Sequence, residues 1–411
     1  MDFGQLRTQP KQAAIFTGNF DVFEQARQLP ICSNMSLTYR LFAERARQPS
    51  LAGARRAGDD QERRAITHRE VAVPLPAVLT GFGKVWIAPM AGGPSSPALV
   101  AAAARAGAFA QLAGGYLTAD ALRTHIEEVQ GVGVAGFGVN LFAPVIHPID
   151  AAEYDAYATQ IAADLPRDTP VPLLREDDDS WAEKVALAIE HQVAVVSFTF
   201  GLPDDEAIAA LDAAGIPWLV TVTTAPEARA AEHAGAAALV VQGTAAGGHS
   251  GVWAQDAWPV EQPLESLLAE VREASSLPLV AAGGITRREQ VEAALGAGAE
   301  AVQVGTAVLL AAEAGTNAAH RAALTDAQFD KTALTRAFTG RPARALVNEF
   351  VERHADAPSG YPALHHLTRP MRSAAAASGD LGRLHLWAGE GWRDVREAPV
   401  ADIVRDLTPT R

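Results

Sequence analysis

Short apolar runs alternate with alanine-rich segments along the chain from Val85 onward. The apolar runs are rich in β-branched residues and the alanine-rich segments end in glycine, an alternation typical of βα units around a buried parallel sheet. Eight runs predict strands, and they begin at Val85, Phe109, Gly136, Ala194, Pro217, Ala238, Pro278 and Ala301. Eight strands separated by helices predict an α/β protein with the architecture of a (β/α)8 TIM barrel.

Residues that start and stop helices support the same alternation. Ser95 and Ser96 precede Pro97, as at a helix N-terminus, and glycines such as Gly215 stand where helices end. The connection over residues 142–192 is long and contains the acidic run Glu176 to Asp179. We expect surface helices in this connection, with the acidic run in a solvated loop.

The pattern divides the chain into three parts. Residues 81–315 hold the predicted strands and form the barrel. Residues 316–411 carry turn signals such as Gly340 and Gly360, and we expect a mainly helical segment that packs on the barrel. Residues 1–80 include an arginine-rich stretch without an apolar period, so we expect a poorly structured N-terminal extension rather than a targeting segment or a partner-binding arm.

Composition narrows the class of protein. The 411 residues are 48% hydrophobic and 20% charged, which excludes disorder of the whole chain. The net charge of -14 argues against a nucleic-acid partner, and Cys32 as the only cysteine precludes an intramolecular disulfide and disfavours a cysteine-based metal site. No apolar run approaches ~18 residues and no secretory signal stands at the N-terminus, so we expect a cytoplasmic protein without a membrane partner.

The predicted strand ends carry the candidate chemistry, because active sites of such barrels lie at the C-terminal ends of the strands. The seventh strand ends in Gly283 and Gly284, and the eighth contains Gly305 and Thr306. Glycine lets backbone N–H groups approach an anion closely, and the threonine hydroxyl adds a donor. We favour a phosphate site over the alternative that these glycines only form tight turns.

A single histidine follows the sixth strand in the glycine-rich stretch from Gln242 to Gly251. We predict that His249 is catalytic, since a loop with few side chains aims the imidazole at a bound ligand, although a structural role remains the alternative. The loop from Ala88 has no acid–base side chain, so a cofactor must supply the chemistry. Asn140, which ends the third strand, either binds a heterocycle edge or caps a turn.

The ordered set of motifs resembles the class I nitronate monooxygenase family, formerly called 2-nitropropane dioxygenases, over about Val85 to Trp392. The motifs are APMAGGPSSP, FGVNLF, VSFTFG, VVQGTAAGGHSG, AAGGI and QVGTAVL at the strand ends, followed by FTGRPAR and LWAGEGW. The AGGH element alone is shared with other FMN barrels, whereas the whole set is more specific. The chain departs from the family at Ser250, where arginine is frequent, and at Glu390, where glutamine is frequent.

The resemblance implies non-covalently bound FMN, with His249 as the active-site histidine. It places the isoalloxazine ring near Met90 and Asn140. The predicted cofactor contacts are Ala88, Pro89, Met90, Asn140, Gln242, Gly243, Gly247, Gly248, Gly283, Gly284, Gly305 and Thr306. The implied reaction oxidises a nitronate, such as propionate 3-nitronate, with O2 to a carbonyl compound and nitrite, without a metal or a nicotinamide cofactor.

Two other functions stay open at this point. An FMN-dependent NAD(P)H:quinone or enoyl reductase shares the barrel and the AGGH loop, and a flavin-binding protein without turnover belongs to another class. The sequence also leaves open the physiological nitronate, the use of neutral nitroalkanes, and whether the protein is a monomer or a homodimer.

Overall fold

The computed structural model describes residues 73–410 except residues 135 and 145–147. The arginine-rich stretch of the predicted N-terminal extension lies outside the described residues. Among those described, no helix is long and apolar enough to cross a bilayer.

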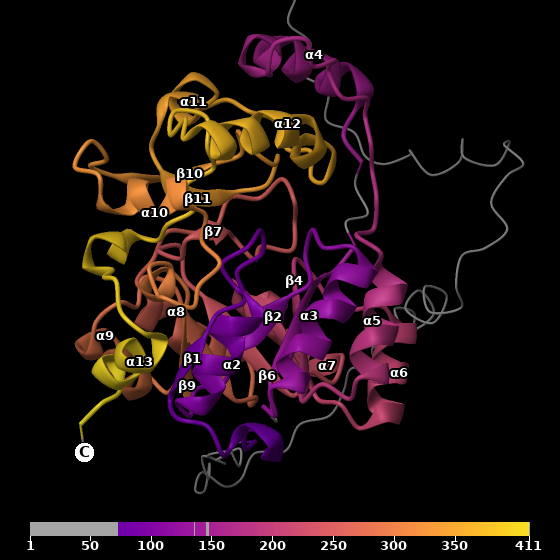
Figure 1. The fold of residues 1–411 in the computed structure, drawn as a ribbon. Helices are drawn as coiled ribbons and strands as arrows, with labels where there is room; N and C mark the ends of the chain where they lie inside the picture. The colour runs from indigo at the N-terminus through magenta and orange to yellow at the C-terminus, as the bar shows by residue number, and fades with distance from the viewer. Residues whose placement is uncertain (1–72, 135, 145–147, 411) are drawn as a thin grey trace, which may run out of the picture. The chain divides into compact units, whose positions relative to one another are not determined.

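Eight parallel strands form the centre of the structure (Figure 1). They are β1 (Val85–Ile87), β2 (Gln111–Ala113), β3 (Gly138–Phe142), β4 (Val195–Thr199), β5 (Trp218–Val222), β6 (Ala238–Gln242), β8 (Leu279–Ala282) and β9 (Ala301–Val304). The order around the sheet is β1-β9-β8-β6-β5-β4-β3-β2, and a parallel bridge from Ile87 to Ala110 brings β1 back to β2. The predicted (β/α)8 barrel is confirmed, since each predicted run forms one strand.

Seven outer helices follow the first seven strands in the expected alternation. They are α2 (Pro97–Arg105), α3 (Ala119–Gly131), α5 (Trp181–Glu190), α6 (Asp205–Ala214), α7 (Ala225–His233), α8 (Leu264–Ala274) and α9 (Arg288–Gly296). Ser96 caps α2 by accepting from the Leu99 N–H, with Pro97 in the first turn. Only the short η3 (Thr306–Val308) directly follows β9, and α13 (Val400–Leu407), close to the end of the chain, packs between α2 and α9. The last helix of the chain thus takes the eighth place in the ring.

Two apolar layers stabilise the barrel. Val100, Val220 and Leu268 belong to the layer between strands and outer helices. Inside the barrel, the rings of Trp86 and Phe109 meet edge to face at 5.1 Å. The interior is therefore a packed core, which leaves the carboxyl ends of the strands for a ligand.

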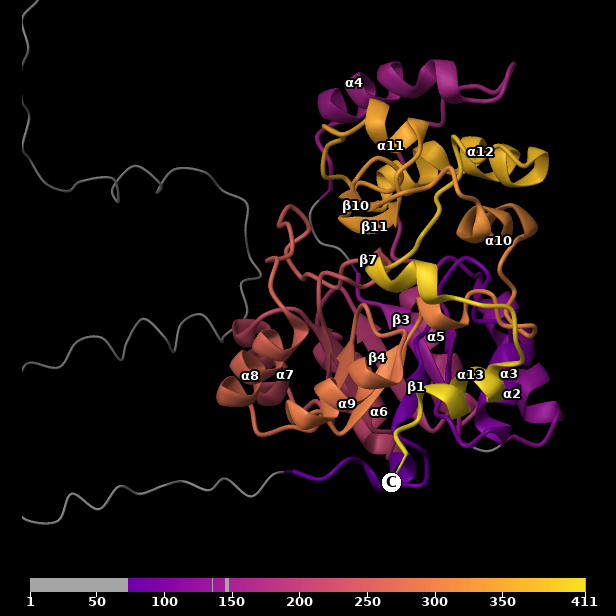
Figure 2. The ribbon, with the colours of Figure 1, turned by 90° about the vertical axis from the view of Figure 1, so that its left-hand side faces the viewer.

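A second group of elements lies over the carboxyl ends of the strands (Figures 1 and 2). It comprises α4 (Ala151–Ile161), η2 (Ala162–Asp164), α10 (Ala318–Thr325), β10 (Thr332–Thr335), β11 (Ala343–Leu346), α11 (Glu349–Arg353), α12 (Ala363–Ser378) and η4 (Glu390–Asp394). We call these elements, together with the segments that join them from α10 to η4, the cap. The mainly helical addition is confirmed, and it also contains the hairpin β10–β11, which the sequence did not predict.

The acidic run in the connection between β3 and β4 is only partly a solvated loop. Glu176, Asp177 and Asp178 are exposed, as expected, but Asp179 lies half-buried. Its carboxylate pairs with buried Lys184 at 2.8 Å and accepts the backbone N–H of Tyr116. The end of this run therefore anchors the loop that carries Tyr116, a tertiary contact invisible in the charge pattern.

Candidate active site

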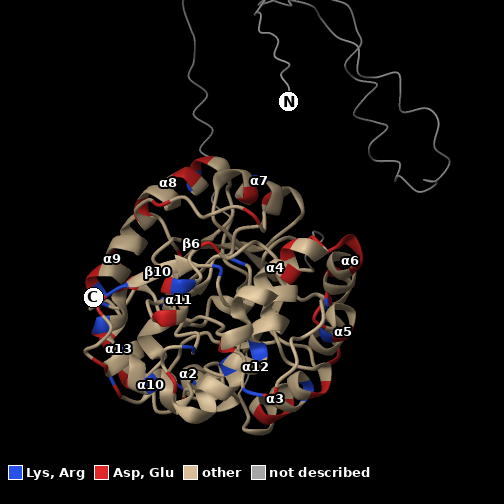
Figure 3. Ribbon diagram, turned by 90° about the horizontal axis from the view of Figure 1, so that it is seen from above, with Lys and Arg blue, Asp and Glu red and all other residues tan. Residues whose placement is uncertain are grey.

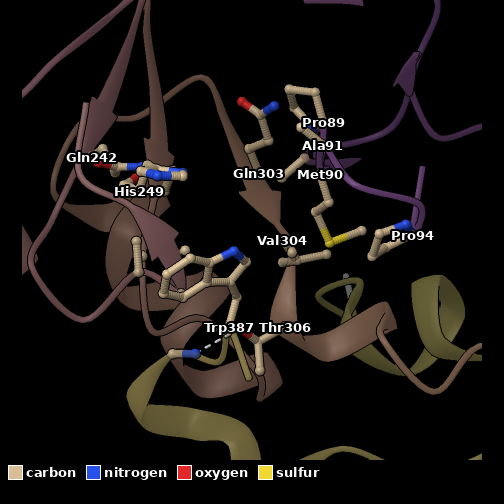
Figure 4. Close-up of a pocket in the computed structure, with 18 of the residues that line it drawn as sticks. Pro89, Met90, Ala91, Pro94, Gln242, His249, Gln303, Val304, Thr306 and Trp387 are labelled. Carbon is tan, nitrogen blue, oxygen red and sulfur yellow. Dashed lines mark hydrogen bonds between the residues drawn. The ribbon is translucent and has the colours of Figure 1, made fainter. Parts of the chain in front are cut away.

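A cavity, partly open to solvent, lies between the carboxyl ends of the strands and the cap. Its empty space, including the solvent at its mouth, is about 1430 Å³. In Figure 4, Pro89, Met90 and Pro94 stand on one side, with Gln242 and His249 opposite and Trp387 and Thr306 below. The cavity thus has walls from both the barrel and the cap.

All but one of the residues predicted for the site line this cavity. The exception is Gly243, whose N–H donates to Ala282 O and whose Cα faces Leu264. The residues that line the cavity are Ala88, Pro89, Met90, Asn140, Gln242, Gly247, Gly248, His249, Gly283, Gly284, Gly305 and Thr306. Neither Ser250 nor Glu390, where the chain departs from the family, is among the lining residues.

The ends of β8 and β9 present free backbone donors. Gly283 and Gly284 have φ values of +114° and +72°, which only glycine adopts readily. The N–H groups of Gly283, Gly284, Gly305 and Thr306 make no hydrogen bond within the described residues, and these partly exposed residues line the cavity. The hydroxyl of Thr306 accepts from Gly389 N at 2.9 Å, which leaves its proton for a ligand. These groups suit a phosphate.

Two polar side chains of the barrel face the middle of the cavity. Asn140 Nδ2 donates to Ser197 Oγ at 2.9 Å and to Thr199 Oγ1 at 3.1 Å, so its carbonyl oxygen is the atom left for a ligand. Gln303 Oε1 is buried without a hydrogen-bond partner in the described part of the chain. A buried orphan acceptor indicates a missing donor, as the N–H of a flat heterocycle would supply.

Gln242 instead holds the histidine loop. Its Nε2 donates to His249 O at 3.2 Å, while its Oε1 accepts Gly251 N at 2.7 Å. The loop continues into the two-residue strand β7 (Gly248–His249), which pairs antiparallel with β11. His249 is thus fixed by the barrel on one side and by the cap on the other.

The imidazole of His249 lies among aromatic rings. Its Nε2 is 2.9 Å from Thr339 Oγ1, and the ring centroids of Trp387 and Phe200 are 5.4 and 5.7 Å away. Burial, together with the charges of Arg341 and Arg372, lowers the pKa of His249 to about 3. The imidazole is therefore neutral at physiological pH.

Several lining residues were not predicted. Tyr116 and Phe200 follow β2 and β4, so the strand-end argument would have found them had it been applied to every strand. His320, His385 and Trp387 come from the cap, and only Trp387 stands in a recognised motif. No sequence pattern marks the two histidines as site residues.

Charged and metal-binding side chains are scarce here. The lining contains no Asp, Glu, Lys or Arg, and no group of three His, Cys, Asp or Glu residues among those described could hold a metal ion. The lining thus offers histidine, hydroxyl and amide groups, with free backbone donors at the carboxyl ends of a (β/α)8 barrel. The fold and the site define a barrel protein suited to a phosphate-bearing cofactor.

Comparison with known proteins identifies the family within this class. The family model "Nitronate monooxygenase" matches residues 79–410, and the chain belongs to that family. A nitronate monooxygenase of Pseudomonas aeruginosa is 38% identical over 78% of this chain and 93% of its own length. A probable nitronate monooxygenase of Bacillus subtilis is 34% identical over 75% of this chain and 90% of its own length.

Solved structures agree with this membership. The crystal structure of a nitroalkane oxidase from Streptomyces ansochromogenes matches with a TM-score of 0.73 and 44% identity, covering 81% of this chain and 96% of that one. FabK from Thermotoga maritima matches with a TM-score of 0.62 and 26% identity, covering 80% and 93%. The predicted family is confirmed, and with it a flavin cofactor.

Proposed function

We propose that this protein binds FMN non-covalently and oxidises alkyl nitronates, such as propionate 3-nitronate, with O2 to carbonyl compounds and nitrite. Family membership supports the reaction class, and the observation that carries the proposal is the uncharged cavity beside a neutral His249. A nitronate is already deprotonated, so its oxidation needs no strong base in the protein.

The free N–H groups of Gly283, Gly284, Gly305 and Thr306 would bind the FMN phosphate. The backbone of Ala88, Pro89 and Met90 would lie against the flat ring, with Asn140 and Gln303 at its polar edge. When bound, the flavin supplies the electron acceptance from substrate and the reaction with O2. The protein contributes binding, orientation and exclusion of water.

His249 would position the substrate next to the flavin. Nε2 lies 2.9 Å from Thr339 Oγ1, and no hydrogen bond to Nδ1 occurs among the described residues. In the tautomer in which Nε2–H donates to Thr339, Nδ1 is the atom that would accept a proton from a neutral nitroalkane. The low pKa of His249 makes the imidazole a weak base, which favours nitronates over nitroalkanes as substrates.

One experiment tests cofactor and substrate class together. The visible spectrum of the purified protein should be that of an oxidised flavin, and anaerobic propionate 3-nitronate should bleach it within the turnover time. Released cofactor should be FMN by mass. Rapid bleaching by NAD(P)H without any response to the nitronate would instead establish the reductase function, and no response to either donor at full flavin occupancy would leave a flavin-binding protein without turnover.

A further inference from the structure

Two buried arginines lie just behind the walls of the uncharged cavity. Arg341 belongs to the turn between β10 and β11, and Arg372 belongs to α12, so the cap supplies both. Arg341 is 0% exposed and Arg372 is 7% exposed. Neither forms a salt bridge with a described residue, which is unusual for buried charges.

Arg341 is short of hydrogen-bond partners. Its Nη2 donates to Val252 O, whereas Nε and Nη1 have no partner among the described residues. The guanidinium carbon lies 4.0 Å from the centre of the Phe200 ring, which lines the cavity. The carboxylate of Glu227 is close enough to act on the pKa of Arg341, but it accepts from Thr223 N and Trp253 N instead.

Arg372, the second arginine, donates its hydrogen bonds to neutral acceptors. Its Nε donates to Thr368 Oγ1 at 3.0 Å, and its Nη2 donates to His365 O at 2.8 Å. The His365 ring stacks on Tyr116 with centroids 4.0 Å apart, and Tyr116 lines the cavity. One ring, that of Phe200, therefore separates Arg341 from the cavity, and two stacked rings separate Arg372 from it.

A charge without a salt-bridge partner in a region of low dielectric acts over several ångströms, because little water screens it. Burial lowers the pKa of His249 most, and the charges of Arg341 and Arg372 lower it further, as expected for guanidinium groups this close to the imidazole. The overall charge of the protein opposes anion binding, whereas the two arginines favour it. The net charge is -14, and acidic residues gather on outer helices such as α6 and α7 (Figure 3).

We propose that Arg341 and Arg372 are positioning residues whose unpaired charges make the cavity selective for small anions over neutral molecules of the same shape. They act through these aromatic rings without touching the ligand. This inference rests on the proposed function in one respect, namely that the anion to be selected is a nitronate. It assigns substrate selectivity to the cap rather than to the barrel.

Acetate and acetamide, which differ in charge and little in shape, test the proposal by binding alone. Their dissociation constants would be measured from the flavin absorbance of holoprotein, for the wild type and for Arg341→Met, Arg341→Lys, Arg372→Met and Arg372→Lys. At an effective dielectric constant of ~20, one unit charge at ~8 Å contributes about 2 kcal/mol, so each methionine variant should bind acetate roughly 10- to 100-fold more weakly. Acetamide binding should change less than about threefold, and the lysine variants should keep most of the acetate affinity.

The lysine variants separate charge from structure, because they lose the guanidinium contacts but keep the positive charge. A wild type that binds acetate no more tightly than acetamide overturns the proposal. Equal losses for both ligands, or equal losses in the methionine and lysine variants, also overturn it. Nitronate turnover is read separately from O2 consumption, so failure of the proposed reaction with intact anion selectivity would be recognised as such.

Discussion

At the residue scale, His249 is the group whose chemistry depends most on its surroundings. An imidazole with a pKa of about 3 stays neutral through the physiological range, although its ordinary value lies near 6.5. Burial excludes water, and both nearby guanidinium groups repel the additional proton. The same residue in an exposed loop would be half-protonated near pH 6.5.

Replacement of His249 should separate the two substrate types. General-base assistance typically contributes about 10²- to 10⁴-fold, and a base with a pKa of about 3 acts at the low end of that range. His249→Asn should therefore lose about 10²-fold in kcat/KM on any neutral nitroalkane that the wild type accepts. The loss with the matching nitronate should be smaller, because only positioning is impaired. Steady-state kinetics on variants with full flavin content check this, and equal slight losses on both substrates would make His249 a structural residue.

Two substitutions of Gly305, one small and one bulky, test the predicted phosphate site. Its φ is negative, and an added Cβ would meet Ala88 Cβ at 3.5 Å, an ordinary contact. Gly305→Ala should therefore retain its flavin, whereas Gly305→Leu should place a side chain in the cavity and lose most of it. Flavin content per chain, from the ratio of absorbance at 450 and 280 nm, measures the outcome. A yellow, fully loaded Gly305→Leu protein would contradict the phosphate assignment.

At the element scale, one buried carboxylate, that of Asp164, links separate segments of the cap through ion pairs. The Asp164 side chain in η2 is 1% exposed and pairs with Arg353, His354 and Arg383. Burial opposes its charged form, yet hydrogen bonds from Arg353 and His354 lower the pKa of Asp164. This residue thus joins the connection that follows β3 to α11 and to the segment leading to Trp387.

Asp164→Asn should lower the free energy of unfolding by about 2 kcal/mol. The value lies below that of a fully buried pair because Arg353 and Arg383 are partly solvated. The control is Asp402→Asn, which removes an exposed pair with Arg405 and should change the free energy of unfolding far less. Urea unfolding of both variants compares them, and equal effects would show that the Asp164 cluster adds nothing to the stability of the cap.

At the scale of the whole molecule, buried histidines link stability to pH. Burial lowers the pKa of His249 to about 3 and of His320 to about 4, and the pKa of His365 and His385 lies well below 6.5. In unfolded chains these groups take up protons near pH 6.5, while the folded protein excludes them. Their stability contribution is complete above pH 6.5 and declines as the pH falls toward 4.

The melting temperature should therefore fall as the pH is lowered from 7 to 5. Each such histidine adds up to about 1.4 kcal/mol per pH unit to the slope of the unfolding free energy. His320→Gln should flatten that slope, whereas His233→Gln, at an exposed site on α7, should leave it unchanged. Calorimetry with excess flavin measures both, and identical slopes in all three proteins would exclude His320 as a source of the acid sensitivity.

The N-terminal part of the chain calls for a separate prediction. The family model begins at residue 79, and the relatives cover 75 to 80% of this chain but at least 90% of their own lengths. The predicted extension of residues 1–80 ends too late, because Leu79 in η1 (Ala77–Leu79) is 1% exposed and packs in the barrel core. We propose that the extension precedes Val71, with the barrel reaching residue 315 and an addition of 316–411. A protein beginning at Val71 should fold and bind flavin as the full chain does, as judged by its melting temperature and absorbance. Insoluble or colourless truncated protein would show that the extension is part of the core.

The sequence by itself determined the barrel of this protein and the glycine-rich loop that carries His249. Strand and helix periods are local properties, so each of the eight strands could be located from its own residues, and the glycines at the ends of β8 and β9 identified their turns. His249 was singled out because its neighbours in the chain are glycines. The same reasoning missed the hairpin β10–β11, whose short strands form only by pairing with each other and with β7.

Only the tertiary structure decided what surrounds His249. Thr339, which holds its Nε2, is 90 residues away in the chain, and Arg341 and Arg372 come from the same distant region. Likewise, α13 joins the helix ring because β9 lacks a long helix of its own. Burial and the loss of counter-ions arise from packing between segments remote in sequence, so no local pattern could reveal a neutral histidine between two unpaired guanidinium charges.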